Sequence, residues 1–511
     1  MFTNFAKRFT YSVLASALAF GCTPEMEQAS PNESLKVEAA NSALLDGTVN
    51  RSVKFKGGHY ILISSTALPA DLESQVRSLK GNVKNMMNEV GIAVVTSSDP
   101  DFAAKAGKIK GVSTVIRDLN VQWFNPADEK MIAFDAEANF GNPPFSGDDD
   151  TYFDLQWGHT AIKAPAAWNA GARGKGVRVA VLDSGFDTDH PDLAPNIDFK
   201  ASISLVPNEP LQYALQGVGS HGTHTAGTIA AADNGRGIIG VAPEAELILV
   251  KVLGDSGVGD FSAILNGIMY ATHQGADVIN MSLGVGLPRN GKYLHDNGTP
   301  DDSSDDFIVS DTKYTQELIN IFTKVTNYAA KQGVTLIASA GNDANNGNKD
   351  QSLVYIPAGA PSVISISATA PLAWALNPLT ANLDFLASYS NYGTSDIDFA
   401  APGGDMAYNG EEVVTVAGIT TYAFAFDLVF SAGSNLEPGK GGYYWSAGTS
   451  MAAPHAAGVA ALIIGQNGGQ MDPAQVKAVM RASADDLGKP GRDPFYGYGR
   501  VNAFKAITAV Q

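Results

Sequence analysis

The chain has 511 residues, of which 45% are hydrophobic and 17% charged, and its formal net charge is -18. This length exceeds that of an average domain, so we expect a large domain with a smaller companion, and the balance of apolar and charged residues excludes a disordered chain. The acidic charge repels phosphate backbones and no Lys/Arg cluster offsets it, so nucleic acid is not an expected partner.

Residues 1–21 have the pattern of a signal peptide. Lys7 and Arg8 precede an apolar run that is too short to span a bilayer. The only cysteine, Cys22, follows in the string AFGC, so an internal disulfide is impossible. AFGC resembles a bacterial lipoprotein box, in which the cysteine is lipidated. We therefore expect export, either as a lipid-anchored protein of the cell envelope or as a secreted protein with an incidental cysteine.

Residues 22–57 are expected to form a linker, and residues 58–124 a small folded unit. The unit reads as a strand (YILIS), a helix (LPADLESQVRSLKG), a second strand (GIAVVTSS), another helix (PDFAAKAGKI) and a last strand (STVIRDLNVQW). This order predicts a small α+β domain of the ferredoxin-like type.

Residues 125–150 are polar, acidic and rich in Gly and Pro, which predicts an exposed linker. In residues 151–511, short apolar runs such as VRVAVLD and ELILVKVL alternate with helical stretches, which predicts a doubly wound α/β domain around a mostly parallel sheet. Sites in such sheets lie beyond the carboxyl ends of the strands. Surface loops are expected at residues 286–314, 371–386 and 420–442.

Three motifs carry side chains suited to nucleophilic catalysis. Asp183 ends a buried strand in VAVLDSG, where a carboxylate needs a partner such as a histidine. His221 follows Ser220 at a predicted helix start, where the helix dipole favours a neutral imidazole that can accept a serine proton. Ser450 begins a helix of small residues in GTSMAAPH, with Pro454 expected in its first turn.

A fourth motif, ASAGND, ends a strand at Asn342, whose amide can join the Ser450 N–H in holding an oxyanion. DSG, HGTHTAG, AGN and GTSMAAPH, in this order, resemble the four hallmark segments of subtilisin-like serine proteases. The resemblance implies an endopeptidase in which Ser450 forms the acyl-enzyme, His221 is the general base and Asp183 orients the imidazole.

The same resemblance extends to the N-terminal half and to substrate binding. Residues 58–124 resemble an inhibitory propeptide removed by self-cleavage within residues 125–150, although an adaptor domain that stays attached is the alternative. DSGVGDF and MSLG resemble the segments that pair with an extended substrate as added strands. Phe261 would wall an apolar subsite, and Tyr355 would lie near the pocket for the residue before the cut. The candidate strand residues are Gly257, Val258, Gly259, Ser282, Leu283 and Gly284.

Calcium is the one cofactor that the resemblance implies, and no organic cofactor is expected. Asp192 in HPDL and Asn234 in AADNGRGIIG resemble the calcium loop of the family, the alternative being a turn cap and a tight loop. His224 lies three residues after His221, but no third ligand is evident, so we expect a packed core histidine. The acidic run HDNGTPDDSSDDF is expected to be solvated surface.

Two other classes of function remain open. A surface binding protein could keep this fold without activity, although the intact Asp183, His221, Ser450 and Asn342 argue against it. A peptide-macrocyclising transferase would use the same acyl-enzyme with an amine acceptor. Because no acceptor domain is visible, hydrolysis of protein or peptide substrates is the leading interpretation.

Overall fold

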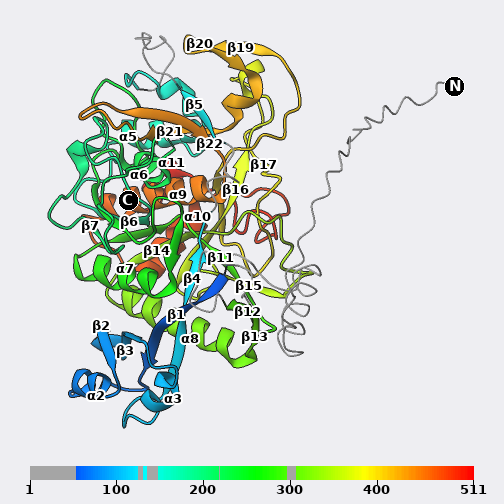
Figure 1. Ribbon diagram of the computed structural model, residues 1–511. Coiled ribbons are helices and arrows are strands. Elements are labelled where there is room, and N and C mark those ends of the chain that lie inside the picture. Colours follow the sequence, from blue (N-terminus) through cyan, green and yellow to red (C-terminus); the bar gives the residue numbers. More distant parts are fainter. Residues whose placement is uncertain (1–52, 125–130, 135–147, 218, 296–306, 511) are drawn as a thin grey trace, which may run out of the picture.

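The computed structural model describes residues 53–124, 131–134, 148–217, 219–295 and 307–510. Within these ranges, a small N-terminal unit packs against a large α/β domain (Figure 1). None of the helices in the described ranges has the length and apolar character needed to cross a membrane. The predicted signal peptide and Cys22 lie outside the described residues.

An eight-stranded sheet forms the centre of the large domain, in the order β17-β16-β14-β10-β6-β8-β7 with β18 beside β16. All its pairings are parallel except that of β16 with β17, which confirms the predicted doubly wound, mostly parallel sheet. The strands are β6 (Arg178–Asp183), β7 (Ile203–Ser204), β8 (Glu246–Lys251), β10 (Val278–Met281), β14 (Thr335–Ser339), β16 (Val363–Ala370), β17 (Phe385–Leu386) and β18 (Phe399–Pro402).

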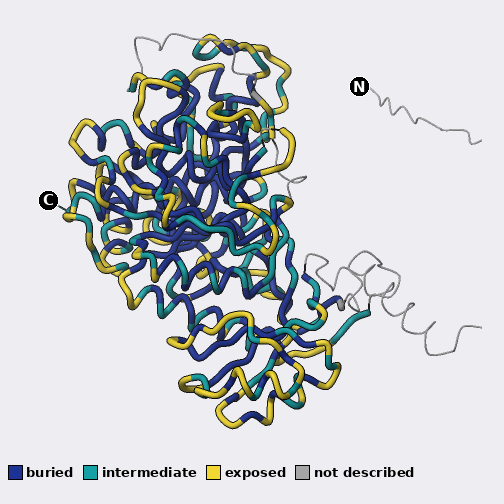
Figure 2. The backbone as a smooth tube through the Cα atoms, turned by 60° about the vertical axis from the view of Figure 1, so that its left-hand side comes forward, coloured by how far each residue is buried: buried dark blue, intermediate teal, exposed yellow. Residues whose placement is uncertain are grey.

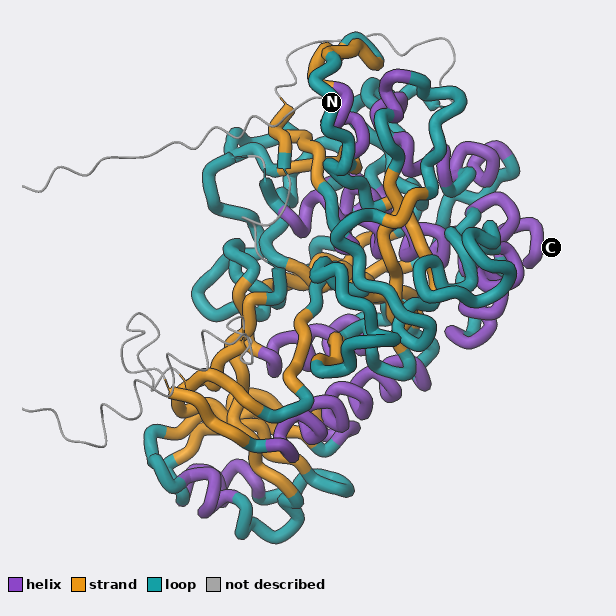
Figure 3. The backbone as a smooth tube through the Cα atoms, turned by 90° about the vertical axis from the view of Figure 1, so that its right-hand side faces the viewer, coloured by secondary structure: helices purple, strands orange, loops and turns teal. Residues whose placement is uncertain are grey.

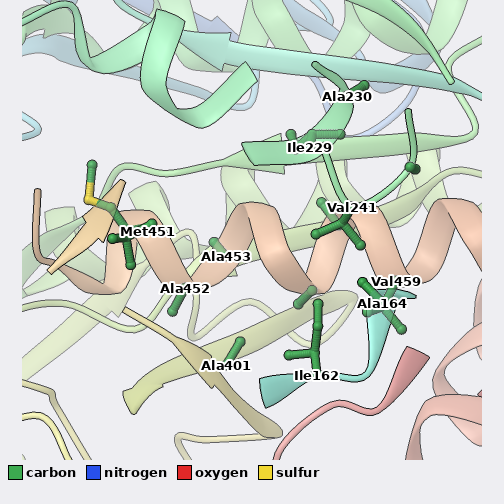
Figure 4. Close-up of a cluster of buried hydrophobic side chains, with 14 of the residues drawn as sticks. Ile162, Ala164, Ile229, Ala230, Val241, Ala401, Met451, Ala452, Ala453 and Val459 are labelled. Atoms are coloured by element: carbon green, nitrogen blue, oxygen red, sulfur yellow. The ribbon is translucent and has the colours of Figure 1, made fainter. Parts of the chain in front are cut away.

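Helices cover both faces of this sheet, because alternate residues of each strand enter different cores. Val179 and Val181 of β6 pack with α6 (His221–Ala230) and α9 (Thr449–Gln466), whereas Ala180 and Leu182 pack with α7 (Phe261–His273) and α8 (Thr312–Lys331). Figure 4 shows the first of these cores, in which alanines let α9 pass close to its neighbours. The remaining helices are α4 (Trp157–Ala161), α5 (Ala164–Asn169), α10 (Pro473–Ser483) and α11 (Ala503–Val510).

The N-terminal unit is an antiparallel sheet with helices on one face, as Figure 3 shows. Its outer face packs under α2 and α3, and its inner face packs on α7 and α8 of the large domain. The unit begins at Val53, before the predicted boundary at residue 58, and contains a strand, β2, that we did not predict. Its elements are β1 (Val53–Ile63), α2 (Leu72–Ser78), β2 (Gly81–Met87), β3 (Ile92–Ser97), α3 (Phe102–Ala106) and β4 (Thr114–Gln122).

The prediction of surface loops was wrong for long parts of two segments. Within residues 420–442, β21 (Val429–Gly433) is buried because its apolar side chains join the core of the large domain, whose interior is mostly dark blue in Figure 2. Part of the predicted linker is also a strand: β5 (Ile132–Phe134) pairs with β22 (Gly442–Ser446). Within residues 286–314 lie β12 (Lys292–His295), β13 (Phe307–Ser310) and most of β11 (Val285–Pro288), which pairs with β15 (Leu353–Ile356).

Candidate active site

Asp183 and His221 form a buried hydrogen-bonded pair. Asp183 ends β6 and is fully buried, and its Oδ1 lies 2.6 Å from Nδ1 of His221 at the start of α6. The Ser184 N–H donates to the same carboxylate at 2.7 Å, and the Thr225 hydroxyl donates to Oδ2 at 3.2 Å. Because an ionised carboxylate only accepts, Nδ1 carries the proton, and Nε2 of His221 is the nitrogen able to take another.

Ser220 fixes the start of α6, as predicted. Its side chain accepts a hydrogen bond from the Thr223 N–H at 3.3 Å and therefore caps the helix. The cap places His221 as the first helical residue, directly across from the end of β6.

Ser450 is the second residue of α9 and is 5% exposed. Its hydroxyl donates to the Ser282 carbonyl at 3.1 Å, and the Ser282 hydroxyl donates to the Ser450 carbonyl at 2.7 Å. Pro454 lies four residues after Ser450, inside the helix and not in its first turn as predicted. Since proline has no N–H, it cannot donate to the Ser450 carbonyl, and Ser282 supplies the missing hydrogen bond.

Asn342 is held against the start of α9. Its Oδ1 accepts hydrogen bonds from the N–H and the hydroxyl of Thr449 at 2.9 and 2.7 Å. A Cβ atom at Gly448 would lie 3.4 Å from Nδ2 of Asn342 and 3.5 Å from the Ser450 nitrogen. Both nitrogens therefore lie within about 3.5 Å of one point at the start of α9, and both carry hydrogens of the kind that can stabilise an oxyanion.

The end of β4 lies between the two segments predicted to bind substrate. Residues 121–122 pair antiparallel with residues 258–259 of β9 (Val258–Asp260). The Trp123 N–H donates to the Gly257 carbonyl at 3.0 Å, and the Gly284 N–H donates to the Trp123 carbonyl at 3.2 Å. The chain of the N-terminal unit thus occupies this cleft as an added strand.

The remaining residues of the MSLG segment have different contacts. Ser282 binds Ser450 as described, and Leu283 is buried with its carbonyl 3.3 Å from the Ser339 hydroxyl. Among the described backbone hydrogen bonds, Gly284 is therefore the residue of this segment that reaches the N-terminal unit, at Trp123 directly after β4.

Aromatic side chains of the N-terminal unit fill the cleft. The Phe124 ring stacks on the His221 imidazole, with centroids 4.1 Å apart and planes 13° apart. The Trp123 ring stacks beside Phe261 at 6.5 Å, and its Nε1 donates to the Gly259 carbonyl at 3.1 Å. Phe261 therefore faces the indole ring of Trp123, the apolar group that occupies this part of the cleft. Sequence reasoning missed Phe124, whose only signal was an aromatic residue at the end of the last strand.

Tyr355 lies beside the segment that carries Asn342. The Asn345 amide donates to its hydroxyl at 3.2 Å, and its ring would lie 3.3 Å from a Cβ atom at Gly341. Burial raises the pKa of Tyr355 to about 12, so the phenol stays neutral. Tyr355 also lines a cavity of about 210 Å³.

Comparison with known proteins gives the family of this chain. Residues 174–499 match the Peptidase_S8 profile, which describes the subtilase family, and this range includes all four motifs. The chain belongs to the subtilase family. Subtilisin from Bacillus pumilus is 35% identical to this subtilase over 348 residues, which cover 68% of this chain and 97% of that protein. Subtilisin NAT from Bacillus subtilis subsp. natto is also 35% identical, with coverage of 68% and 70%.

Solved structures agree with this assignment. The structure of a lanthipeptide protease is 28% identical to this subtilase and has a TM-score of 0.53. The match covers 73% of this chain and the whole of the lanthipeptide protease chain. The epidermin leader peptide processing serine protease of Staphylococcus aureus, 21% identical, has a TM-score of 0.65 over 89% and 98%, which supports the fold alone. By its family and homologues, this subtilase is a serine endopeptidase.

His224 is a core histidine of the subtilase, as predicted. It is fully buried, its Nε2 lies 3.2 Å from the Val429 carbonyl, and its ring packs on Tyr444 at 4.6 Å. Burial lowers the pKa of His224 to about 3, so the ring is neutral. Among the described residues, His224 joins no group of side chains able to hold a metal ion.

The two predicted calcium ligands lie together but are largely engaged by protein donors. Asp192 is fully buried, and its Oδ2 accepts hydrogen bonds from the Ile238 N–H at 3.0 Å and the Tyr443 hydroxyl at 2.9 Å. Nδ2 of Asn234 lies 3.5 Å from Oδ1 of Asp192, and Oδ1 of Asn234 accepts from the Arg236 N–H at 3.1 Å. Both carboxylate oxygens of Asp192 thus accept hydrogen bonds from the protein.

A group of four carboxylates next to Asn234 fits a calcium ion better. Asp148, Asp149, Asp150 and Asp233 place ligand oxygens within 4.8 Å of one another. Asp150 is fully buried; its Oδ1 accepts from the Asn234 N–H, whereas its Oδ2 has no hydrogen-bond donor among the described residues. Burial and the neighbouring Asp148 raise the pKa of Asp150 to about 8. A buried, undonated oxygen in a group of carboxylates suits a hard cation such as Ca²⁺.

Proposed function

We propose that this subtilase hydrolyses peptide bonds in proteins through an acyl-enzyme on Ser450. His221 accepts the Ser450 proton at Nε2 and returns it to the leaving amine, and Asp183 orients the imidazole and stabilises the imidazolium. The buried hydrogen bond of 2.6 Å between Asp183 and His221 is the observation that carries the proposal. Nδ2 of Asn342 and the Ser450 N–H hold the oxyanion.

Substrates bind as an extended strand between residues 257–259 and 282–284. The proposal is supported by residues 121–123, which lie in this cleft with backbone hydrogen bonds on both sides. Main-chain pairing of this kind gives affinity with little dependence on sequence, and pockets such as those beside Phe261 and Tyr355 select side chains.

The N-terminal unit, residues 53–124, acts as the inhibitor of a self-processing precursor. Phe124 covers the His221 imidazole, so the cleft cannot take another protein as substrate while this end of the unit is in place. Self-cleavage within residues 125–150 breaks the covalent link, and the unit inhibits the mature enzyme until it dissociates. If Cys22 is lipidated after export, the lipid anchors the precursor and the cleaved unit, and the mature enzyme stays near the membrane only while that unit is bound.

A fluorophosphonate, which reacts with activated serines, tests the nucleophile directly. We expect it to label Ser450 after the linker has been cut and the N-terminal unit has dissociated, because Phe124 no longer covers His221. Mass spectrometry of the digested protein locates the label. Heat-denatured enzyme is the control and should take up none. A mature, casein-cleaving sample labelled at another serine would contradict the assignment.

We further propose a structural calcium ion held by Asp148, Asp149, Asp150 and Asp233. The ion would neutralise carboxylates that otherwise repel one another and would tie residues 148–150 to the loop before Asn234. Asp192 then supports the loop through its hydrogen bonds to the Ile238 N–H and the Tyr443 hydroxyl.

Removal of calcium should destabilise the enzyme. A ligand at a thousand times its Kd stabilises the native state by about 4 kcal/mol, so we expect EDTA to lower Tm by about 10 °C, as measured by calorimetry. Asp150→Asn should lose more than half of this calcium-dependent shift, because it removes a charged ligand. Glu411→Gln, an exposed change outside the group, should keep all of it. Equal Tm values with and without EDTA would exclude the site.

A further inference from the structure

A hairpin of the large domain extends the sheet of the N-terminal unit. Strands β12 and β13 pair antiparallel, from Lys292 with Ser310 to His295 with Phe307. β12 also pairs in parallel with the start of β1, where Lys54 lies opposite Leu294 and Phe55 opposite His295. The two domains therefore share one seven-stranded sheet, and Figure 1 shows β12 and β13 beside β1.

An aromatic cluster reinforces this pairing. Phe55 is 3% exposed, and its ring contacts Tyr314 edge-on at 4.8 Å and Tyr293 at 5.4 Å. The two tyrosines contact each other at 5.0 Å, and the Tyr293 hydroxyl lies 2.6 Å from that of Thr315. The Tyr314 hydroxyl donates to the Arg117 carbonyl at 2.7 Å. Two tyrosines of the large domain thus pack on one phenylalanine of the N-terminal unit, and Tyr314 is also hydrogen-bonded to that unit.

The hairpin and the catalytic cleft bind different strands of the N-terminal unit. The cleft holds residues 121–124, at the end of β4, whereas the hairpin holds residues 53–55 of β1, which pair with residues 119–121 on their other side. Cleavage after residue 124 leaves both contacts intact. Substrate competes with the N-terminal unit for the cleft but not for the hairpin. When substrate displaces the end of the unit from the cleft, the hairpin still holds the unit, so its effective concentration near the cleft stays high.

We propose that β12, β13, Tyr293 and Tyr314 form a second docking site whose partner is the strand of residues 53–55. The site keeps the cleaved N-terminal unit bound as an inhibitor and selects this unit over others that lack an aromatic side chain at the position of Phe55. The inference rests on the proposed inhibitory role of the unit, and it names the surface that sets how long inhibition lasts.

The docking site can be tested without self-processing. In full-length Ser450→Ala, residues 125–130 are replaced by the recognition sequence of an added protease, and the cut protein is diluted through a size-exclusion column. We expect the N-terminal unit and the large domain of the parent to co-elute at concentrations at which those of Phe55→Ala elute separately. The Kd of the Phe55→Ala complex should be at least 100-fold higher than that of the parent. Tyr293→Ala changes only the large domain and should weaken binding similarly.

A double-mutant cycle distinguishes docking from loss of folding. Because Phe55 and Tyr293 contact each other, the Kd of the double variant should be only slightly higher than that of the single variant that binds less tightly. Met86→Ala, a 39% exposed position on β2, should bind like the parent. If both single variants co-elute as the parent does, the hairpin is not a docking site. This assay does not need catalysis. If the wild-type chain failed to cut itself, the proposed self-processing would be contradicted, but the binding result for the hairpin would still hold.

The same variants have a kinetic signature in the active enzyme. Wild-type protein should show a lag between linker cleavage on a gel and hydrolysis of a small chromogenic peptide, and Tyr293→Ala should shorten the lag at least 10-fold. Its kcat/KM for casein after complete activation should equal that of wild type. A parallel loss of kcat/KM for casein would overturn the proposal, since the hairpin would then be a general substrate site.

Discussion

Replacement of Ser450 by alanine should abolish both peptidase activity and maturation. Alanine offers no nucleophile at the start of α9, and the corresponding change in subtilisin itself is known to lower kcat by about 10⁶-fold. We expect the variant to stay full length, whereas the unmodified chain loses its N-terminal unit and cuts casein. Mass spectrometry measures the chain length, and the mass of the wild-type product locates the cleavage point within residues 125–150.

A second serine serves as the matched control for this experiment. Ser483 is 3% exposed in α10, and its hydroxyl donates to the Val479 carbonyl at 2.8 Å, so Ser483→Ala removes a buried hydroxyl from a helix that carries none of the proposed catalytic residues. This variant should mature and cut casein within about threefold of wild type. If Ser450→Ala matures and cleaves casein as wild type does, Ser450 is not the nucleophile.

The sequence was sufficient to predict the main features of the catalytic domain. Each of the four motifs couples a secondary-structure boundary to a chemical group. Asp183 ends one parallel strand and Asn342 follows another, and His221 and Ser450 lie in the first turns of buried helices. Ends of parallel strands meet at one edge of the sheet, so these positions had to lie close together. The apolar runs of the strands were equally clear because a sheet covered on both faces needs buried residues throughout.

Features that depend on pairing between distant segments could not be predicted. The strand KYLH at 292–295 has no apolar alternation that distinguishes it from a loop, and it becomes a strand because β1 and β13 lie on its two sides. β5 similarly exists through its pairing with β22. Phe124 could not be assigned to the site, since its stacking on His221 depends on how the whole N-terminal unit sits on α7 and α8.

The position of Pro454 was predicted wrongly because a tertiary hydrogen bond overrides the local preference of proline for the first turn of a helix. Proline was expected in the first turn of α9, where its missing N–H costs nothing. It lies deeper because the hydroxyl of Ser282, which follows β10, satisfies the carbonyl that the proline leaves without its helical donor. A hydrogen bond between residues 168 positions apart thus permits a helix that local propensity disfavours, and it links Ser450, the proposed nucleophile, to the proposed substrate-binding segment.

Asp183→Asn should lower kcat by about 10⁴-fold with a smaller change in KM, as measured with a chromogenic peptide. The asparagine amide would donate toward Nδ1 of His221, so the imidazole proton would move to Nε2 and the Ser450 proton would have no acceptor. Thr225→Val removes only one hydrogen bond to the carboxylate, at 3.2 Å, and should cost less than about 10-fold. Equal losses in the two variants, at unchanged Tm, would contradict an orienting role for Asp183, because the tautomer changes in the first variant alone.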